Sequence, residues 1–145
     1  MATPDRDGLA DSLVSIGEDA IATSNDALLD DYYTDDYELH SPAGAFHRDE
    51  IKAYFAALRE SFADFTISRA QILVDGNFVA ARTVMAGRFE KEFAYTPIGT
   101  VEPNGQHVRW ELINIFRYTD EGCLVEEWVQ TDTYDFLRQL GAVES

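Results

Sequence analysis

Cysteine is nearly absent from this chain of 145 residues. Cys123 is the single cysteine, so an internal disulfide and a zinc site built from cysteines are both excluded. No apolar run approaches the roughly 20 residues that a membrane-spanning helix needs. The segment from Met1 to Asp11 also lacks the apolar stretch of a signal peptide. We therefore expect a cytoplasmic protein with no membrane partner.

Positive charge is scarce as well. Lys and Arg total 11 against 27 Asp and Glu, which gives a formal net charge of -16. Nucleic acids and anionic membranes both select basic surfaces, so neither is expected as a partner. Lys52 and Lys91 are the two lysines, and carboxylates are spread along the whole chain. This pattern is typical of proteins that stay soluble in concentrated salt, with an ordinary acidic bacterial enzyme as the alternative.

Several common functional motifs are missing. The chain contains no G-x-x-x-x-G-K-[ST] loop, no G-x-G-x-x-G and no G-x-S-x-G, which argues against phosphoryl transfer, dinucleotide redox chemistry and a serine hydrolase. The three histidines, His40, His47 and His107, show no paired metal-ligand spacing, so we predict no metal site.

The hydrophobic pattern divides the chain into a helical first half and a strand-rich second half, which favours a single α+β domain over residues 1–145 with a core over about 9–141. A strongly curved, mostly antiparallel sheet wrapped by helices leaves a cone-shaped interior suited to a small molecule. The predicted helices cover residues 9–21, 27–33, 47–63 and a short segment from Asp132 or Thr133 to Leu140. The predicted strands cover residues 37–40, 65–74, 78–89, 107–118 and 123–131, the last four forming an antiparallel meander.

Two sets of residues resemble a known family. Asn25-Asp26-Ala27-Leu28-Leu29, followed by Tyr32-Tyr33 and residues 37–42, resembles the first helix-to-strand segment of the nuclear-transport-factor-2-like cone fold. The run from Ile113 to Tyr118, then Val125-Glu126-Glu127-Trp128, Asp132 and Phe136-Leu137-Arg138-Gln139-Leu140-Gly141, resembles the SnoaL-like polyketide (ester) cyclases.

This resemblance implies an intramolecular aldol ring closure on a polyketide ester, with no metal and no organic cofactor. It also implies a homodimer that pairs through the outer face of the sheet, and by position it makes Asp132 the acid/base. One position departs from the pattern, because Phe89 stands where many such sequences carry a histidine. That departure favours a different substrate or a non-catalytic role.

The last predicted strand presents Glu126, Trp128, Gln130 and Asp132 on one face, since strand side chains alternate. A carboxyl group in an apolar pocket can both remove and deliver a proton. Asp132 is therefore the candidate catalytic residue, and capping of the final helix is its alternative role. Gln130 is a candidate for orienting a carbonyl group, and Trp128 for stacking on a flat substrate or filling the core.

The preceding strand places Trp110, Leu112, Asn114, Phe116 and Tyr118 on one face. Aromatic walls with a few polar groups suit a ligand pocket, so Trp110, Asn114, Phe116 and Tyr118 are candidate substrate-binding residues. A buried amide needs a partner, which is either a ligand or the backbone. His40 ends the first strand and is a second catalytic candidate, as a proton carrier beside Asp132, or else a strand-end residue bonded to a nearby turn.

Together these features predict a small-pocket enzyme that performs cofactor-independent acid/base chemistry on an apolar carbonyl compound, by cyclisation, isomerisation or dehydration. The alternatives are a non-catalytic small-ligand-binding module and a homodimeric interaction protein whose own aromatic side chains fill the cone.

Overall fold

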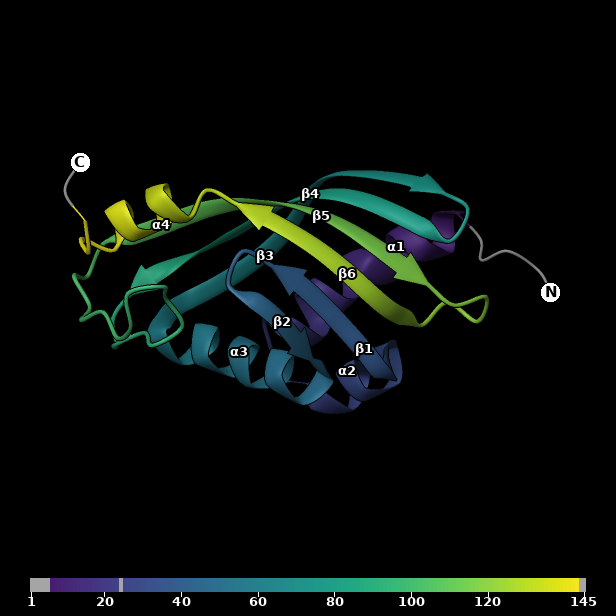
Figure 1. The fold of residues 1–145 in the computed structure, drawn as a ribbon, viewed down its shortest axis with the longest axis horizontal. Helices are drawn as coiled ribbons and strands as arrows, with labels where there is room; N and C mark the ends of the chain where they lie inside the picture. Colours follow the sequence, from purple (N-terminus) through teal and green to yellow (C-terminus); the bar gives the residue numbers. More distant parts are fainter. Residues whose placement is uncertain (1–5, 24, 144–145) are drawn as a thin grey trace.

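The computed structural model describes residues 6–23 and 25–143, so the first five residues of the N-terminal segment and the last two of the chain lie outside the described part. It confirms an α+β fold with a curved sheet (Figure 1). The helices are α1 (Arg6–Ile16), the π-helical turn η1 (Gly17–Ile21), α2 (Asp26–Tyr32), α3 (Arg48–Ser61) and α4 (Thr133–Gln139). The strands are β1 (Tyr33–Ser41), β2 (Gly44–His47), β3 (Phe62–Asp75), β4 (Phe78–Phe89), β5 (His107–Tyr118) and β6 (Leu124–Thr131).

The sheet has the strand order β2-β1-β6-β5-β4-β3. Strands β3 to β6 form the expected antiparallel meander, and β1 joins its far edge by parallel pairing with β6. The short strand β2 was not predicted, because Ser41-Pro42 indicated the end of extended structure. Instead the chain turns there and pairs back antiparallel on β1, with Ser41 opposite Gly44, whose φ of 121° suits glycine.

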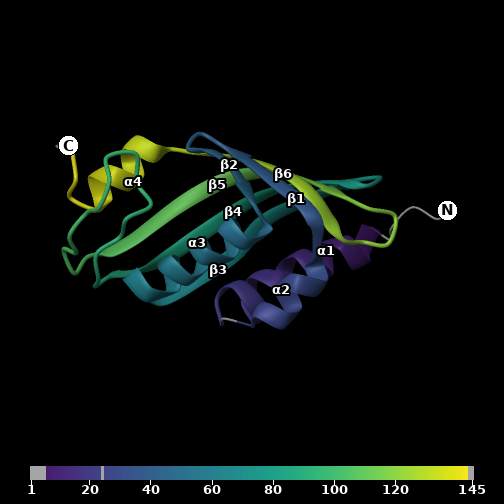
Figure 2. The same cartoon turned by 60° about the horizontal axis from the view of Figure 1, so that its bottom comes forward.

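Helices α1, α2 and α3 cover the concave side of the sheet, as Figures 1 and 2 show from two directions. In α1 the buried residues Leu9, Leu13 and Ile16 recur at helical spacing and face β3. In α3 the buried residues Ile51, Phe55 and Leu58 also recur at helical spacing, and this helix packs against β1 and β3. The helices therefore close the cone predicted from the pattern of apolar residues.

The bend of the sheet has a local cause at the start of β3. The pairing register with β4 shifts between Ala63 and Thr66, which marks a β-bulge. Opposite the bulge lies Gly87, where an added Cβ atom would come within 2.7 Å of the Cβ of Phe62. A residue without a side chain is needed there, because the two strands approach too closely for any other.

Within residues 6–23 and 25–143, no helix combines the length and apolar character needed to cross a membrane. The same described residues contain no cluster of three or more His, Cys, Asp or Glu side chains that could hold a metal ion.

Candidate functional site

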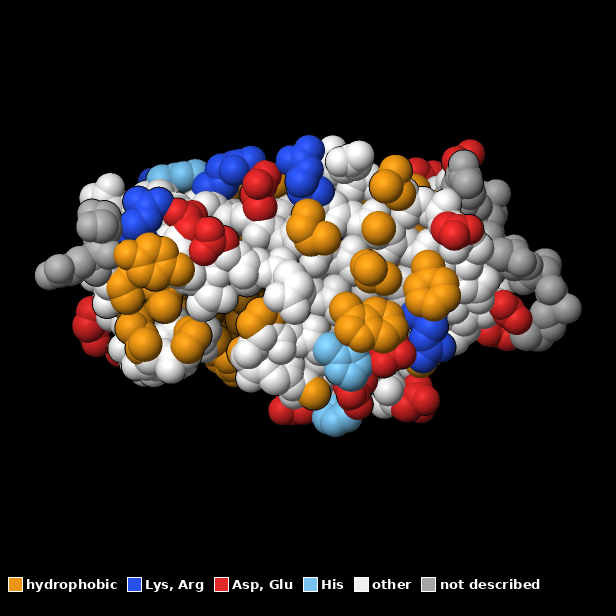
Figure 3. All heavy atoms as spheres, turned by 45° about the horizontal axis from the view of Figure 1, so that its top comes forward, with side chains coloured by type: hydrophobic (Ala, Val, Ile, Leu, Met, Phe, Trp, Pro, Cys, Tyr) orange, Lys and Arg blue, Asp and Glu red, His pale blue; other side chains and the backbone are white. Residues whose placement is uncertain are grey.

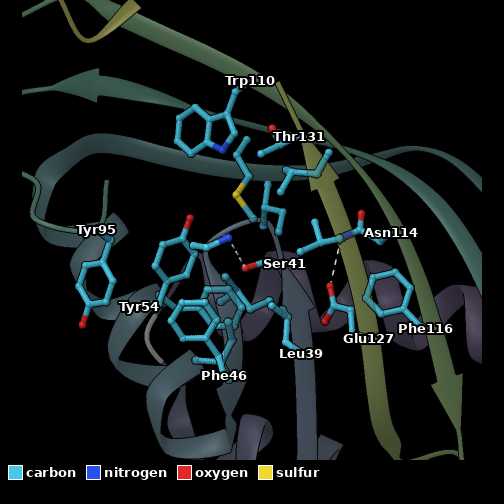
Figure 4. Close-up of a pocket in the computed structure, with 18 of the residues that line it drawn as sticks. Leu39, Ser41, Phe46, Tyr54, Tyr95, Trp110, Asn114, Phe116, Glu127 and Thr131 are labelled. Carbon is cyan, nitrogen blue, oxygen red and sulfur yellow. Dashed lines mark hydrogen bonds between the residues drawn. The ribbon is translucent and has the colours of Figure 1, made fainter. Parts of the chain in front are cut away.

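A cavity of about 760 Å³ lies between the concave face of the sheet and the helices. Figure 4 shows its aromatic walls, with Trp110 from β5 above and Tyr54 from α3 and Tyr95 from the loop after β4 at one side. Such a volume is in the range that small-molecule sites use. Among the described lining residues, Arg69 and Glu127 are the two with charged side chains.

A row of five polar side chains crosses the concave face, one from each strand except β2. We call it the polar row: it consists of Tyr37 (β1), Glu127 (β6), Asn114 (β5), Thr83 (β4) and Arg69 (β3). The hydrogen-bond distances between neighbours are 2.7 Å from Tyr37 to Glu127, 3.1 Å from Asn114 to Glu127, 2.7 Å from Thr83 to Asn114 and 2.8 Å from Arg69 to Thr83. Figure 4 shows the bond that joins Asn114 to Glu127.

The chemistry of the two ends fixes the direction of these bonds. The guanidinium of Arg69 can only donate, so the Thr83 hydroxyl accepts from it and donates its own hydrogen to Oδ1 of Asn114. The amide nitrogen of Asn114 must then face Glu127, and it donates to Oε2 of that carboxyl group. Every donor in the row points toward Glu127, which receives the last hydrogen bond from the Tyr37 hydroxyl at Oε1.

Glu127 is buried, with 7% of its surface exposed. Burial raises the pKa of its carboxyl group above the usual 4.5, because the charged form is desolvated. The hydrogen bond from Tyr37, the charge of Arg69 and the hydrogen bond from Asn114 each oppose that shift in pKa. A carboxyl group whose pKa is moved toward neutrality, in an apolar cavity, is suited to exchanging a proton with a bound molecule.

Burial also raises the pKa of Tyr37 well above its ordinary value, and the neighbouring charge of Glu127 adds to this shift. Tyr37 therefore remains a neutral donor to Glu127. A second phenol pair lies close by: the hydroxyl of Tyr32, which lines the cavity, is hydrogen-bonded to that of Tyr118.

The β5 residues lie where the alternation of that strand predicts. Trp110, Asn114 and Phe116 line the cavity, and Tyr118 is buried behind Tyr32 without lining it. Substrate binding by these four residues stays a prediction. All four lie on the inner face of the sheet, because buried and exposed residues alternate without a break over most of β5.

The expected positions of Trp128, Gln130 and His40 need correction. Trp128 is 38% exposed on the outer face of the sheet, Gln130 is exposed two residues further on, and neither lines the cavity. His40 is on the same outer face, stacked on Trp128, with its Nε2 atom 2.7 Å from Glu126. The alternation along β6 was recognised, but the opposite set of side chains, Glu127, Val129 and Thr131, faces the cavity.

Asp132 lies at the N-cap of α4, where its side chain accepts a hydrogen bond from the backbone N–H of Asp135. It is exposed and does not line the cavity, although its neighbours Thr131 and Thr133 do. It borders a separate, polar recess of about 200 Å³ with Arg109, Glu111 and Asp135. The capping alternative thus describes its position, and its catalytic role stays a prediction.

Phe89 is fully buried and does not line the cavity. Its ring stacks on Phe62 with the centroids 5.2 Å apart. The side chain at this position therefore belongs to the core beside the bent part of the sheet.

Sequence reasoning missed Glu127, Thr83 and Arg69. A usable signal was present for Arg69, because Phe65, Ile67 and Arg69 alternate along one strand and the first two are buried. Alternation along the last strand places Glu127 on the face opposite Asp132, and nothing in the pattern marks that face as the inner one.

The sequence profile of the SnoaL-like polyketide cyclase family matches residues 13–140, and the chain belongs to this family. The family is one of cyclase-type enzymes that bind small apolar ligands in a cavity. A search of curated protein sequences gives no significant match.

Solved structures share the fold over nearly the whole chain. A protein from Jannaschia sp. CCS1, assigned as a SnoaL-like polyketide cyclase, superimposes with a TM-score of 0.81 at 18% identity, covering 99% of this chain and 98% of that one. IdmH from Streptomyces antibioticus, assigned as a polyketide cyclase, gives 0.76 at 25% identity, covering 92% and 98%. AclR from Streptomyces galilaeus, assigned as a hydroxylase, gives 0.77 at 21% identity, covering 97% and 87%.

Proposed function

We propose that this protein is a cyclase-type enzyme that performs acid/base chemistry on an apolar carbonyl compound, with Glu127 as the group that takes and returns the proton. The observation that carries the proposal is the buried carboxyl group of Glu127 on the wall of a largely apolar cavity, with its pKa raised by desolvation. The likeness to IdmH, assigned as a polyketide cyclase, supports a polyketide-like substrate.

The proposed reaction begins with the Glu127 carboxylate removing a proton from a carbon next to a carbonyl group. The electron pair of the broken C–H bond forms a C=C bond, and the carbonyl oxygen becomes an enolate. In an aldol closure the enolate carbon attacks a second carbonyl of the same molecule, and Glu127 returns its proton to the alkoxide formed there. Atoms and charge balance, so the reaction needs no oxidant or reductant, and the proposal includes neither an organic cofactor nor a metal.

The polar row supports this use of Glu127. Tyr37 and Asn114 each donate to one carboxyl oxygen, which holds the group in place and leaves lone pairs on both oxygens. Because Asn114 can only donate there, a proton bound by Glu127 must lie toward Tyr37 or the cavity. The row thereby keeps the exchangeable proton off the side of the carboxyl group that faces Asn114.

The test is exchange of the α-protons of 2-tetralone, a flat apolar ketone, for deuterium, followed by NMR. We expect the protein to accelerate exchange and the Glu127→Gln variant to lose roughly 10²–10⁴-fold of that acceleration, the usual contribution of general acid/base catalysis. Glu126→Gln is the matched control, since Glu126 is on the outer face.

Asp132→Asn, measured in parallel, separates the two carboxyl groups. Unchanged exchange in Glu127→Gln with loss in Asp132→Asn would assign the chemistry to Asp132 instead. Binding of 2-tetralone with no acceleration by the wild-type protein would favour the non-catalytic ligand-binding alternative.

The proposal includes a homodimer formed through the outer face of the sheet. Ile113, Ile115 and Trp128 are exposed there, and Ile115 is paired with Trp128 across strands β5 and β6. Figure 3 shows apolar side chains across this face among charged ones. Light scattering should give the mass of a dimer for the wild-type protein and of a monomer for Ile115→Glu. Ile98→Glu, at an exposed loop position, should remain dimeric.

We also propose a cytoplasmic location, in keeping with the single free thiol of Cys123. Adaptation to concentrated salt stays a hypothesis that rests on the net charge of -16.

A further inference from the structure

Arg69 differs from the other arginines of the described part in its surroundings. Six of them form ion pairs with surface carboxylates: Arg48, Arg82, Arg88, Arg109, Arg117 and Arg138. Arg69 lines the cavity instead, and its one hydrogen bond among the described residues goes from Nη1 to the neutral hydroxyl of Thr83. Arg69 thus has no ion pair among the described residues, although the chain carries 27 carboxylates.

One N–H group of the Arg69 guanidinium also lacks a hydrogen-bond acceptor. Its Nε atom is buried and has no partner among the described residues. A buried donor without an acceptor costs about 1–3 kcal/mol. Nε itself is covered, so a molecule in the cavity would reach Arg69 through the other N–H groups of its guanidinium.

Besides Thr83, apolar groups pack against the guanidinium of Arg69. Its guanidinium carbon lies 5.5 Å from the centre of the Phe116 ring, a cation–π distance. Gly17 of η1 lies above it, and an added Cβ atom there would be 3.8 Å from Nη2 and 3.2 Å from Ile67. A positive charge that is partly surrounded by apolar groups interacts more strongly with an anion than the same charge in water does.

Glu127 does not neutralise Arg69 directly. The two side chains are joined through Thr83 and Asn114 in the polar row, and the positive charge of Arg69 lowers the pKa of Glu127 only as a secondary effect. The cavity therefore holds a base and a cation on the same wall, two hydrogen-bonding side chains apart.

We infer that Arg69 binds a negatively charged oxygen of the substrate, and that the substrate is an enolisable carbonyl compound whose oxygen is anionic when bound or becomes so in the reaction. This inference rests on the proposed function for the identity of the base. When Glu127 removes the proton, the electron pair moves to the carbonyl oxygen, and Arg69 holds the charge that develops there. Because the guanidinium of Arg69 is planar, it also favours substrates whose anionic group is planar and delocalised.

The experiment compares the binding of two probes of equal shape, 2-naphthoate and 2-naphthamide, by titration calorimetry. One carries a carboxylate and the other a neutral amide. We expect the protein to bind 2-naphthoate about 10-fold more tightly, the size of effect of one charge-assisted hydrogen bond. Arg69→Met should remove this preference, and Arg69→Lys should keep part of it because the charge remains.

Arg82→Met is the matched control. Arg82 is on the adjacent strand, exposed, and paired with Glu111 on the outer face, so its replacement should leave the preference intact. Arg69→Lys also keeps the test decisive if Arg69→Met does not fold. Equal affinity of the wild-type protein for the two probes, or a preference that survives in Arg69→Met, would overturn the inference.

Glu127→Gln distinguishes failure of this inference from failure of the proposed function. Removal of the neighbouring negative charge should tighten 2-naphthoate binding and leave 2-naphthamide binding unchanged. If that result appears while Glu127→Gln keeps its deuterium-exchange activity, Arg69 is an anion site and Glu127 is not the base. If Glu127→Gln loses exchange but the probes bind equally, Glu127 is the base and the assignment of Arg69 fails.

Discussion

Glu126 and Glu127 are neighbours in one strand and meet opposite environments. Glu127 faces the cavity, where burial raises its pKa and its partners are the neutral donors Tyr37 and Asn114. Glu126 faces outward, where hydrogen bonds from His40 and Arg117 lower its pKa. Two identical side chains, one residue apart, are thus prepared for different tasks. The alternation of a strand is sufficient to separate a buried carboxyl group with a raised pKa from an ion-paired one with a lowered pKa.

The largest loss of stability should come from a substitution at Thr83, which interrupts the polar row that includes Glu127. In Thr83→Val the shape is kept, but Arg69 loses its acceptor and Asn114 loses its donor, both in buried surroundings. We expect a loss of about 3 kcal/mol in the free energy of unfolding, measured by urea denaturation. The control is Thr66→Val, at an exposed position of the same sheet, which should change it by less than about 0.5 kcal/mol. Equal losses in the two variants would show that the row contributes nothing to stability.

A smaller effect should distinguish the two glutamates: their contributions to the free energy of unfolding should change with pH in opposite directions. Because the pKa of Glu127 is raised on folding, the folded state binds this proton more tightly, and wild-type stability falls as the pH rises above about 4.5. Glu127→Gln lacks this loss, so the free energy of unfolding of the variant relative to that of the wild-type protein should increase with pH and then level off.

Glu126→Gln should show the opposite sign. The pKa of Glu126 is lowered on folding, so its contribution is present above the ordinary pKa of 4.5 and disappears as the pH falls through the folded value. The variant should be less stable than the wild-type protein at neutral pH, by a few tenths of a kcal/mol, and equal to it in acid. Thermal unfolding of the three proteins between about pH 4 and 8 measures both differences; parallel curves would contradict the assigned environments.

Much of the fold was predictable because it depends on local patterns. The switch from helical spacing in residues such as Ile51, Phe55 and Leu58 to alternation in β4 and β5 gave the α+β class and the meander. Strand β2 was missed because its four residues carry no apolar alternation, and its existence depends on pairing with β1. The parallel pairing of β1 with β6 joins segments about 90 residues apart, which no local pattern reveals.

The site was only half predictable for a related reason. Alternation gives two faces of a strand but does not say which is inside, and on β5 the aromatic residues Trp110 and Phe116 identified the inner one. On β6 both faces carry a glutamate, and the large residue Trp128 lies outside. The inner face there is defined by contacts with β5, where Asn114 meets Glu127, and such a contact follows only from the register of the sheet.

The one-way order of donors in the polar row also limits how this chain can evolve. A new residue at Asn114 or Thr83 must accept on the side of Arg69 and donate on the side of Glu127, so most single replacements leave a buried donor or acceptor without its partner. Paired replacements avoid that conflict. We therefore expect positions 69, 83, 114 and 127 to vary together among descendants of a common ancestor, with intermediates of low fitness between the permitted combinations.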